Sequence, residues 1–413
     1  MDTLLSNSLD SKSNMPSAGF PHVLHVGKFY PPHMGGIETH LRDLCKNLCE
    51  SVQLKVVVAN DDRSVLREVL DGVSISRVPT WATLASTPIC PGMIREIRDF
   101  DGEIVHLHFP NPMSVLAYLL SGHRGTMVVT YHSDMVRQVF LGRMFEPLLH
   151  WALRRSSAII ATSPNYVETS PVLSAYRDKC RVIPLGIPID SFLHPELPAV
   201  LELQQKYQGR LVVSVGRLVY YKGFEYLIRA MAKVRGHLLI VGQGPLHPQL
   251  ESLIAGLGLS DHVQLLGKLS HQQLVNVYHA AQVFALASVA RSEAFGIAQV
   301  EAMAAGLPVV NTSLESGVPY VSQHERTGLT VPPADPNALA SAINMLFDDS
   351  ELRGSYARAA KLRAQEEFSA EGMASRTSAL YRELAGFSAQ DRTTNTANHT
   401  PLGSIVSRVF QSH

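Results

Sequence analysis

Short apolar runs alternate with helical patterns over the first half of the chain. The apolar runs that predict strands lie at residues 22–27, 54–59, 73–78, 104–108, 126–131, 158–162 and 181–185. Between them, apolar residues recur at helical spacing at 37–48, 91–99 and 112–121. Strands that alternate with helices are typical of a doubly wound parallel sheet. The first half of the chain therefore predicts an α/β domain.

The alternation begins again at Leu211, after a segment with several prolines and a short charged helical pattern. The run LVVSVG resembles LHVG near the start of the chain, so we expect a second domain of the same kind. The predicted division is a disordered tail at 1–20, an N-terminal Rossmann-like domain at 21–190, a linker at 191–209, a C-terminal Rossmann-like domain at 210–370, a C-terminal helix at 371–387 and a disordered tail at 388–413.

Composition narrows the class of protein. Of the 413 residues, 46% are hydrophobic, which is enough for full domain cores. Lys plus Arg and Asp plus Glu balance at 36 each, so the chain has no general electrostatic attraction for nucleic acid. The four cysteines form no CxxC pair, which favours a reducing, cytoplasmic compartment. The sequence has no apolar run long enough to predict a membrane span and no signal-peptide pattern at its start.

The stretch from Ser292 to Asn311 carries the main candidate chemistry. A carboxylate, Glu293, precedes the turn Phe295-Gly296, and a helical pattern that contains Glu301 follows. The start of a helix offers unpaired N–H groups that suit a phosphate, whereas carboxylates suit hydroxyl groups. This combination fits a sugar nucleotide. The alternative is an amphipathic surface helix with two solvated glutamates.

Three further loops follow predicted strands. Gly35 and Gly36 follow the first strand and open a helical pattern, where backbone can approach a ligand closely. Arg217 and Lys222 follow the strand at 211–216 and would suit a diphosphate, although two basic residues in a loop are more often surface charge. His132 ends the strand at 126–131, where ligands collect in open α/β sheets. GxGxxG is absent, which disfavours a nicotinamide oxidoreductase.

Two patterns resemble metal sites and are interpreted as structural. Asp99 and Asp101 form an Asp-x-Asp, but they precede a strand, where Asp-Gly makes a turn. His106 and His108 share one face of a strand, and the sequence shows no third ligand for them. We therefore predict no metal site.

The segment from Arg137 to Arg155 combines aromatic and aliphatic residues with four arginines. It predicts either an ordinary helix on the sheet, broken at or near Pro147, or an interfacial helix on anionic lipid. Trp81, Phe140 and Phe145 stand in or near first-domain loops, where their rings could stack on a sugar or meet lipid.

The order of these motifs resembles retaining glycosyltransferase family 4, whose members have the GT-B fold. The matching motifs are GGIE at 35–38, YHSD at 131–134, GRL with Lys222-Gly223, VGQGP at 241–245, SEAFGIAQVEAMAAGLPVV with Glu-x7-Glu, and SGVPYV with RTGLTVPPAD. The resemblance covers roughly residues 21 to 385. It implies two Rossmann-like domains that face a central cleft, with the C-terminal helix returning to the first domain. It also implies a nucleotide-sugar donor, with no metal or other cofactor.

The resemblance also assigns roles to residues. Arg217 and Lys222 match the groups that hold the donor diphosphate, Glu293 the carboxylate at the sugar hydroxyls, and Glu301 the one at the ribose. His132 matches a histidine that contacts the sugar near the reacting carbon. The implied catalytic residues are His132, Arg217, Lys222 and Glu293. The implied donor-binding residues are Gly35, Gly36, Arg217, Lys222, Gly242, Gly244, Glu293, Phe295, Gly296, Ile297 and Glu301.

One departure is Tyr320, which stands where the family's turn Gly-Gly-x-Pro-Glu has an acid. His132-Ser133-Asp134 resembles the surface-polysaccharide mannosyltransferase subgroup and favours GDP-mannose. The expected function is retaining transfer of a hexose, mannose by preference, to a glycan or polyprenyl-linked acceptor in the cytoplasm, at the inner face of the membrane. The alternatives are a UDP-sugar-dependent transferase, a sugar-nucleotide epimerase or hydrolase, and an inactive sugar-nucleotide-binding scaffold.

Overall fold

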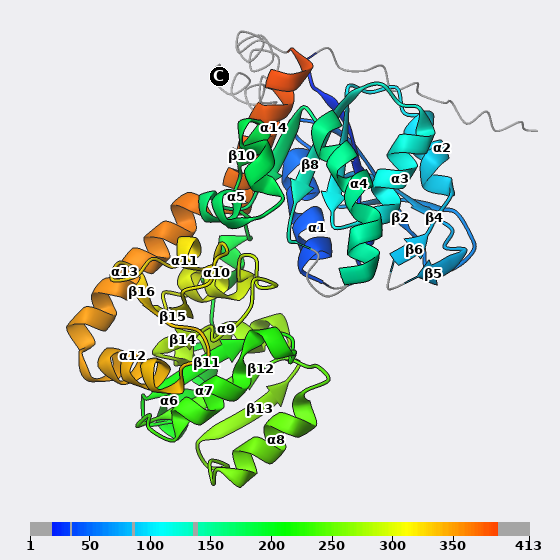
Figure 1. The fold of residues 1–413 in the computed structure, drawn as a ribbon. Helices are drawn as coiled ribbons and strands as arrows, with labels where there is room; N and C mark the ends of the chain where they lie inside the picture. Colours follow the sequence, from blue (N-terminus) through cyan, green and yellow to red (C-terminus); the bar gives the residue numbers. More distant parts are fainter. Residues whose placement is uncertain (1–18, 34, 85–86, 135–138, 387–413) are drawn as a thin grey trace, which may run out of the picture.

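The computed structural model describes residues 19–33, 35–84, 87–134 and 139–386. Two separate sheets of mainly parallel strands, each with helices packed against it, form two Rossmann-like domains (Figure 1). This architecture confirms the predicted α/β fold and its repetition in two halves of the chain.

The first sheet has the strand order β10-β9-β8-β7-β1-β2-β4-β3. Its strands are β1 (His22–Val26), β2 (Gln53–Ala59), β3 (Leu66–Leu70), β4 (Val73–Val78), β7 (Ile104–Phe109), β8 (Thr126–Tyr131), β9 (Ala158–Ala161) and β10 (Cys180–Val182). Only β3 runs antiparallel to its neighbour, β4. The apolar pattern does not predict β3, because this edge strand is mostly exposed. Its signal is the turn Asp71-Gly72, where both residues have positive φ, as a two-residue hairpin requires.

Most helices of this domain follow the predicted segments, whereas its second hairpin was not predicted. These elements are α1 (Gly36–Leu48), β5 (Ala82–Leu84) with β6 (Thr87–Ile89), α2 (Gly92–Arg98), α3 (Pro112–Ser121), α4 (Val139–Arg155) and α5 (Pro164–Thr169). The break expected near Pro147 is wrong, because α4 continues through it. Proline removes a helical hydrogen bond, but Phe145, Leu148 and Trp151 pack on the core and hold the helix in place. Residues 135–138 and the side chains of 139–144, including Arg137 and Phe140, lie outside the described residues.

The second sheet is fully parallel, with the order β13-β12-β11-β14-β15-β16. Its strands are β11 (Leu211–Val215), β12 (His237–Val241), β13 (Val263–Gly267), β14 (Val283–Ala285), β15 (Val309–Thr312) and β16 (Gly328–Val331). Its helices are α6 (Leu197–Lys206), α7 (Phe224–Met231), α8 (His247–Gly256), α9 (His271–Ala280), α10 (Ile297–Ala304), α11 (Val318–Val321), α12 (Pro336–Asp348) and α13 (Ser350–Glu367). The strand order reverses between β11 and β14, which makes this position the topological switch point.

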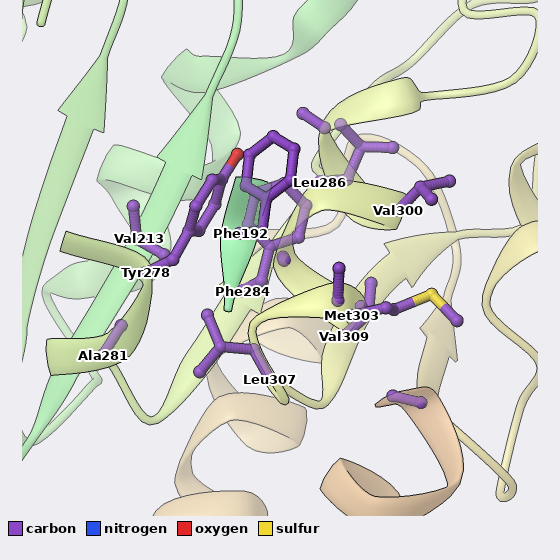
Figure 2. Close-up of a cluster of buried hydrophobic side chains, with 14 of the residues drawn as sticks. Phe192, Val213, Tyr278, Ala281, Phe284, Leu286, Val300, Met303, Leu307 and Val309 are labelled. Atoms are coloured by element: carbon purple, nitrogen blue, oxygen red, sulfur yellow. The ribbon is translucent and has the colours of Figure 1, made fainter. Parts of the chain in front are cut away.

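Apolar side chains fix α9 and α10 on one face of the second sheet. Figure 2 shows Tyr278 of α9 beside Phe192 and Phe284, with Val300 and Met303 of α10 near the strands. Each large apolar side chain buried in this way contributes about 1.5–3 kcal/mol. The packing holds the start of α10 at the carboxyl end of the sheet.

The last described helix, α14 (Ala370–Ala385), returns to the first domain and packs on α1 (Figure 1). Met373, Leu380 and Tyr381 are buried in the same cluster as Val23 of β1 and Leu44 of α1. This return confirms the expectation from the family resemblance. No helix in the described ranges is long and apolar enough to cross a membrane.

Candidate active site

The loops after β11 and β14 meet in a nearly buried ion pair. Nζ of Lys222 lies 2.5 Å from Oε2 of Glu293, and the two side chains are 12% and 9% exposed. β11 and β14 are the neighbours between which the strand order reverses. Ligands of open α/β sheets bind beyond the carboxyl ends of the strands at this point. The pair therefore lies where a ligand of the second domain is expected.

Glu293 keeps Lys222 charged. Burial by itself lowers the pKa of an amine, because it disfavours the cation. At Lys222 the attraction of Glu293 and its hydrogen bond outweigh burial, and the net pKa is raised. Gly216 also makes room for this side chain, because a Cβ at Gly216 would lie 3.2 Å from Cε of Lys222, at a φ of 159°. The loop thus presents a permanent positive charge.

The carboxylate of Glu293 is held from one side. The hydroxyl of Ser288 donates to Oε2 at 3.0 Å, and Lys222 uses the same oxygen. No described residue forms a hydrogen bond or ion pair with Oε1. One oxygen is therefore fixed by the protein, and the other can accept from a ligand hydroxyl.

A helix begins directly after this carboxylate. Gly296 precedes α10 with φ of 74°, and a Cβ there would meet Leu286 at 2.7 Å. The N–H of Gln299 donates to the carbonyl oxygen of Gly296 at 2.9 Å. No described side chain caps α10, and the N–H groups of Ile297 and Ala298 in its first turn are those that would suit an anionic oxygen. The side chain of Phe295 packs edge-on against Phe368 and is 3% exposed. Of Phe295, only the backbone can face a ligand.

Glu301 lies on α10, at the face that meets α9. Its Oε2 accepts from the hydroxyl of Tyr278 at 2.8 Å. Burial raises the pKa of Glu301, while Tyr278, His271 and Lys222 act in the opposite direction. The influence of Lys222 places Glu301 near the ion pair, as the predicted common site requires.

The other predicted donor-binding residues differ in exposure and packing. Arg217 is exposed, and no described residue forms an ion pair with it. Gly242 and Gly244 pack on backbone, because a Cβ at either would lie 2.0 or 2.4 Å from the carbonyl oxygen of Gly216 or Leu218. Their packing explains these two glycines without a ligand, and their role in donor binding stays a prediction.

The first domain contributes its own strand ends. His132 follows β8, is 7% exposed, and its Nε2 lies 3.2 Å from Nδ1 of His108. Its Nδ1 has no hydrogen-bond partner among the described residues. Gly35 and Gly36 begin α1, and a Cβ at Gly36 would meet nothing within 4 Å. The role of these two glycines in ligand binding stays a prediction.

An ion pair between the domains joins the two groups of candidate residues. Arg291 of the second domain donates to Oδ2 of Asp134 at 3.1 Å and also reaches Glu315 at 3.4 Å. Asp134 is two residues after His132, and Arg291 is two residues before Glu293. The loops that carry His132 and Glu293 are therefore adjacent. The sequence analysis missed Arg291, because a single arginine in a loop has no distinguishing pattern.

The structure explains three other residues that the sequence left ambiguous. The ring centroids of Tyr320 and Phe368 lie 6.1 Å apart, and the guanidinium of Arg363 lies over the Tyr320 ring. Tyr320 therefore fills the space between α11 and α13. Asp99 follows the last turn of α2 and pairs with Arg95, and Asp101 is exposed. These contacts agree with the structural interpretation of the Asp-x-Asp pattern.

His106 and His108 share a face, as predicted, and further imidazoles that the sequence spacing does not show lie close to them. His25, His106 and His108 form one group of close ring nitrogens, and His40, His108 and His132 form another. The histidines come from different elements, β1, α1, β7 and the end of β8, so sequence spacing cannot show their proximity.

Comparison with known families divides the chain in the same way as its two sheets. Residues 34–191 match the family model described as Glycosyltransferase Family 4. Residues 202–363 match the one described as Glycosyl transferases group 1.

Relatives match over nearly their whole length. The chain is 33% identical to D-rhamnosyltransferase WbpZ of Pseudomonas aeruginosa, over 84% of this chain and 92% of that protein. It is 30% identical to O-antigen chain mannosyltransferase C of Escherichia coli, over 88% and 98% of the two chains. It is 27% identical to the GDP-mannose-dependent alpha-(1-6)-phosphatidylinositol monomannoside mannosyltransferase of Mycolicibacterium smegmatis, over 79% and 89%.

Solved structures show the same architecture. The sucrose-phosphate synthase of Thermosynechococcus elongatus superposes with a TM-score of 0.74, covers 89% of this chain and 100% of its own, and is 24% identical. This likeness establishes the GT-B fold. With relatives at 30% identity or more over almost their full length, the chain belongs to glycosyltransferase family 4 and is a hexosyltransferase.

Proposed function

We propose that this glycosyltransferase moves mannose from GDP-mannose to a hydroxyl group of a glycan or lipid-linked sugar, with retention of the anomeric configuration. The observation that carries the proposal is the buried Lys222–Glu293 pair at the start of α10. It combines a cation and free amide groups for a diphosphate with a carboxylate for sugar hydroxyls. The two mannosyltransferase relatives support the choice of sugar, and the mycolicibacterial one supports the choice of base.

The charges account for departure of the nucleotide. As the glycosidic bond breaks, negative charge collects on the diphosphate, and fixed cations and amides stabilise that charge. Lys222 is held charged by Glu293, and the exposed Arg217 is available for bidentate contact with phosphate oxygens. In this proposal Lys222, Arg217 and the α10 amides do what a metal ion does in other transferases. Activity should accordingly be unchanged by EDTA.

Retention follows from where the acceptor attacks. Lys222 and Ser288 engage Oε2 of Glu293, and in this proposal Oε1 accepts from a sugar hydroxyl, which together disfavour the carboxylate as a covalent nucleophile. We therefore propose that the acceptor hydroxyl attacks from the face that the nucleotide leaves. Its oxygen bonds to the anomeric carbon, the bond to the phosphate oxygen breaks, and that phosphate oxygen takes the proton.

D-Rhamnose is the second candidate sugar, because WbpZ is a D-rhamnosyltransferase. D-Rhamnose is 6-deoxy-D-mannose, so the two donors differ only in a hydroxyl group at C6. A site that hydrogen-bonds a hydroxyl rejects the analogue without it by about 10⁴-fold or more, whereas an apolar pocket discriminates far less. The ratio of kcat/KM for the two GDP-linked sugars therefore decides between them.

The acceptor would approach the first domain. Exposed apolar side chains lie on β3 and on the β5–β6 hairpin, namely Leu66, Val69, Trp81 and Leu84. We propose that they meet a lipid-linked acceptor at the inner face of the membrane. In contrast, Phe145 and Trp151 of α4 pack on the core, which removes part of the apolar surface expected of the Arg137–Arg155 segment. Failure to bind anionic liposomes at low salt would count against this contact.

Product analysis tests the proposed reaction. GDP-mannose is incubated with a lipid-linked or oligosaccharide acceptor, and the product is analysed by mass spectrometry and by NMR of the anomeric proton. The expected product carries one added hexose in α configuration, the configuration of the donor. Free mannose alone would indicate a hydrolase, a changed sugar at constant donor mass an epimerase, and a β product would overturn retention.

A further inference from the structure

A continuous row of side-chain hydrogen bonds crosses the first domain from its interior to His132. Thr130 Oγ1 lies 2.7 Å from Nε2 of His106, whose Nδ1 contacts the hydroxyl of Tyr381 at 2.5 Å. Tyr381 in turn lies 3.1 Å from Nε2 of His25. Nδ1 of His25 lies 3.0 Å from Nε2 of His108, and Nδ1 of His108 lies 3.2 Å from Nε2 of His132.

All members of this row are buried, and its histidines are neutral. Burial lowers the pKa of His25 to about 3, and it lowers the pKa values of His106, His108 and His132 well below 6.5, with neighbouring histidines adding to the effect. Burial raises the pKa of Tyr381, so its hydroxyl keeps its proton. Each imidazole therefore has one N–H and one acceptor nitrogen.

Because each group in the row has one N–H or O–H, the position of one hydrogen determines the positions of all the others. Each contact needs one hydrogen, and each neutral imidazole supplies only one, so a complete row has only two arrangements. Either every hydrogen points towards His132 or every hydrogen points away from it. The hydroxyl of Tyr381 contacts both His106 and His25. Because it accepts from one imidazole and donates to the other, it links the tautomer of His106 to that of His25.

The buried end of the row favours one direction. Thr130 is 2% exposed, and His106 is the partner of its hydroxyl among the described residues. If the hydrogens pointed away from His132, the Thr130 hydroxyl would accept from His106 and its own hydrogen would have no acceptor there, which is unfavourable in a buried position. If they point towards His132, each of the five contacts is made, and the one hydrogen without a partner in the row lies on His132, at the end next to the site. His132 then carries its hydrogen on Nδ1, the nitrogen without a described partner.

We propose that Tyr381 of the C-terminal helix is a positioning residue that fixes His132 as the Nδ1–H tautomer, a hydrogen-bond donor towards the bound sugar. The proposal rests on the proposed function, in which His132 contacts the donor sugar. It gives the return of α14 to the first domain a role in catalysis as well as in stability. His132 can donate to a sugar oxygen without bringing a charge to the site.

A metal ion is the competing explanation of the cluster. His40, His108 and His132 place three ring nitrogens within 4.8 Å of one another, and neither ring nitrogen of the buried His40 has a hydrogen-bond partner. However, a divalent ion there would be buried among neutral ligands, and among the described residues no carboxylate contributes to the pKa values of these histidines. Burial of an uncompensated charge is costly. A metal would also leave the contacts of Tyr381 unexplained.

The test is Tyr381→Phe, which removes the hydroxyl and keeps the ring. Two-bond ¹⁵N–¹H correlation spectra distinguish Nδ1–H from Nε2–H tautomers, and loss of one signal set in His132→Gln assigns His132. We expect one Nδ1–H form in the wild type and a mixture in Tyr381→Phe, with kcat lowered about tenfold and the KM for the donor little changed. Tyr176→Phe is the matched control, because it removes a hydroxyl that contacts His150 at 2.7 Å outside the row.

Three results would overturn the proposal. The first is an Nε2–H form of His132 in the wild type, and the second is an Nδ1–H form that Tyr381→Phe leaves unchanged. The third is a stoichiometric transition metal in the purified protein that is lost in His40→Gln. The spectra need neither donor nor acceptor, so the tautomer result stands even if GDP-mannose proves not to be the substrate.

Discussion

The two domains present polar groups of opposite character to the site between them. In the second domain, Lys222 and Glu293 form a nearly buried ion pair. In the first domain, five histidines are buried and neutral, and four of them are joined to Tyr381 and to one another. A nucleotide sugar has the same asymmetry, with a diphosphate at one end and an uncharged sugar at the other. The comparison suggests that fixed positive charge is concentrated where the leaving group needs it, while the histidines of the first domain offer the sugar uncharged hydrogen-bonding groups.

We call the Lys222–Glu293 pair and its loops in the second domain the charged side, and the buried histidines of the first domain the neutral side. Removal of the Lys222 cation should have the largest effect on stability and turnover. Lys222→Met leaves Glu293 buried without a counter-ion, which costs about 3–5 kcal/mol of stability. It also removes stabilisation of the leaving diphosphate, so kcat/KM should fall by about 10³-fold or more. Steady-state kinetics and thermal melting measure the two effects.

A double variant separates stability from catalysis. Lys222→Met with Glu293→Gln removes both charges, so the melting midpoint should recover while turnover does not. More than a tenth of wild-type turnover in Lys222→Met, or in Glu293→Ala, would contradict the assignment of this pair.

Arg217 sharpens the comparison within the charged side, because it is exposed and has no ion pair with a described residue. Arg217→Ala should raise the KM for the donor about 10- to 100-fold and leave the melting midpoint unchanged. Arg326, another exposed arginine of the same domain, provides the control, and Arg326→Ala should change neither quantity. A lower melting midpoint in Arg217→Ala would indicate a structural role.

The buried histidines of the neutral side should make the stability of the protein depend on pH. The folded pKa values of His25 and His40 are lowered to about 3 and about 4, below the ordinary value near 6.5. Between these values the unfolded chain binds more protons, so the free energy of unfolding falls as the pH falls. Each such histidine contributes up to about 1.4 kcal/mol per pH unit.

Melting between pH 7 and pH 4.5 measures this slope. His40→Phe should lower the slope of the unfolding free energy against pH by the contribution of one histidine, because the variant has one fewer histidine to protonate on unfolding. It should not greatly reduce stability at pH 7, since the ring nitrogens of His40 have no partners to lose. An unchanged slope would show that His40 is already protonated in the folded protein.

Local patterns were enough to predict most of the fold and the charged side of the site. The apolar runs predicted the strands that the sheets bury on both faces, and Glu293, Lys222 and Gly296 stand in loops whose position follows from those strands. The exposed edge strand β3 was missed, because an exposed strand need not be apolar. The hairpin signal at Asp71-Gly72 could have identified it.

The neutral side depends on contacts between distant parts of the chain. Tyr381 is 275 residues from His106 and 356 from His25. No spacing rule relates these positions, because the return of α14 brings Tyr381 to the histidines. The pair of Arg291 and Asp134 spans 157 residues for the same reason. Only the three-dimensional structure shows such partners.

Donor binding by the charged side is the central claim, and thermal melting with equal concentrations of GDP, GDP-mannose, UDP and UDP-glucose tests it most directly. A ligand that binds only the folded state raises the melting midpoint. The account predicts a rise with GDP and GDP-mannose, without added metal, and none in the Lys222→Met, Glu293→Gln double variant. A rise with the uridine nucleotides alone would contradict the assignment of the donor. The same rise in the double variant would show that the nucleotide does not bind at Lys222 and Glu293.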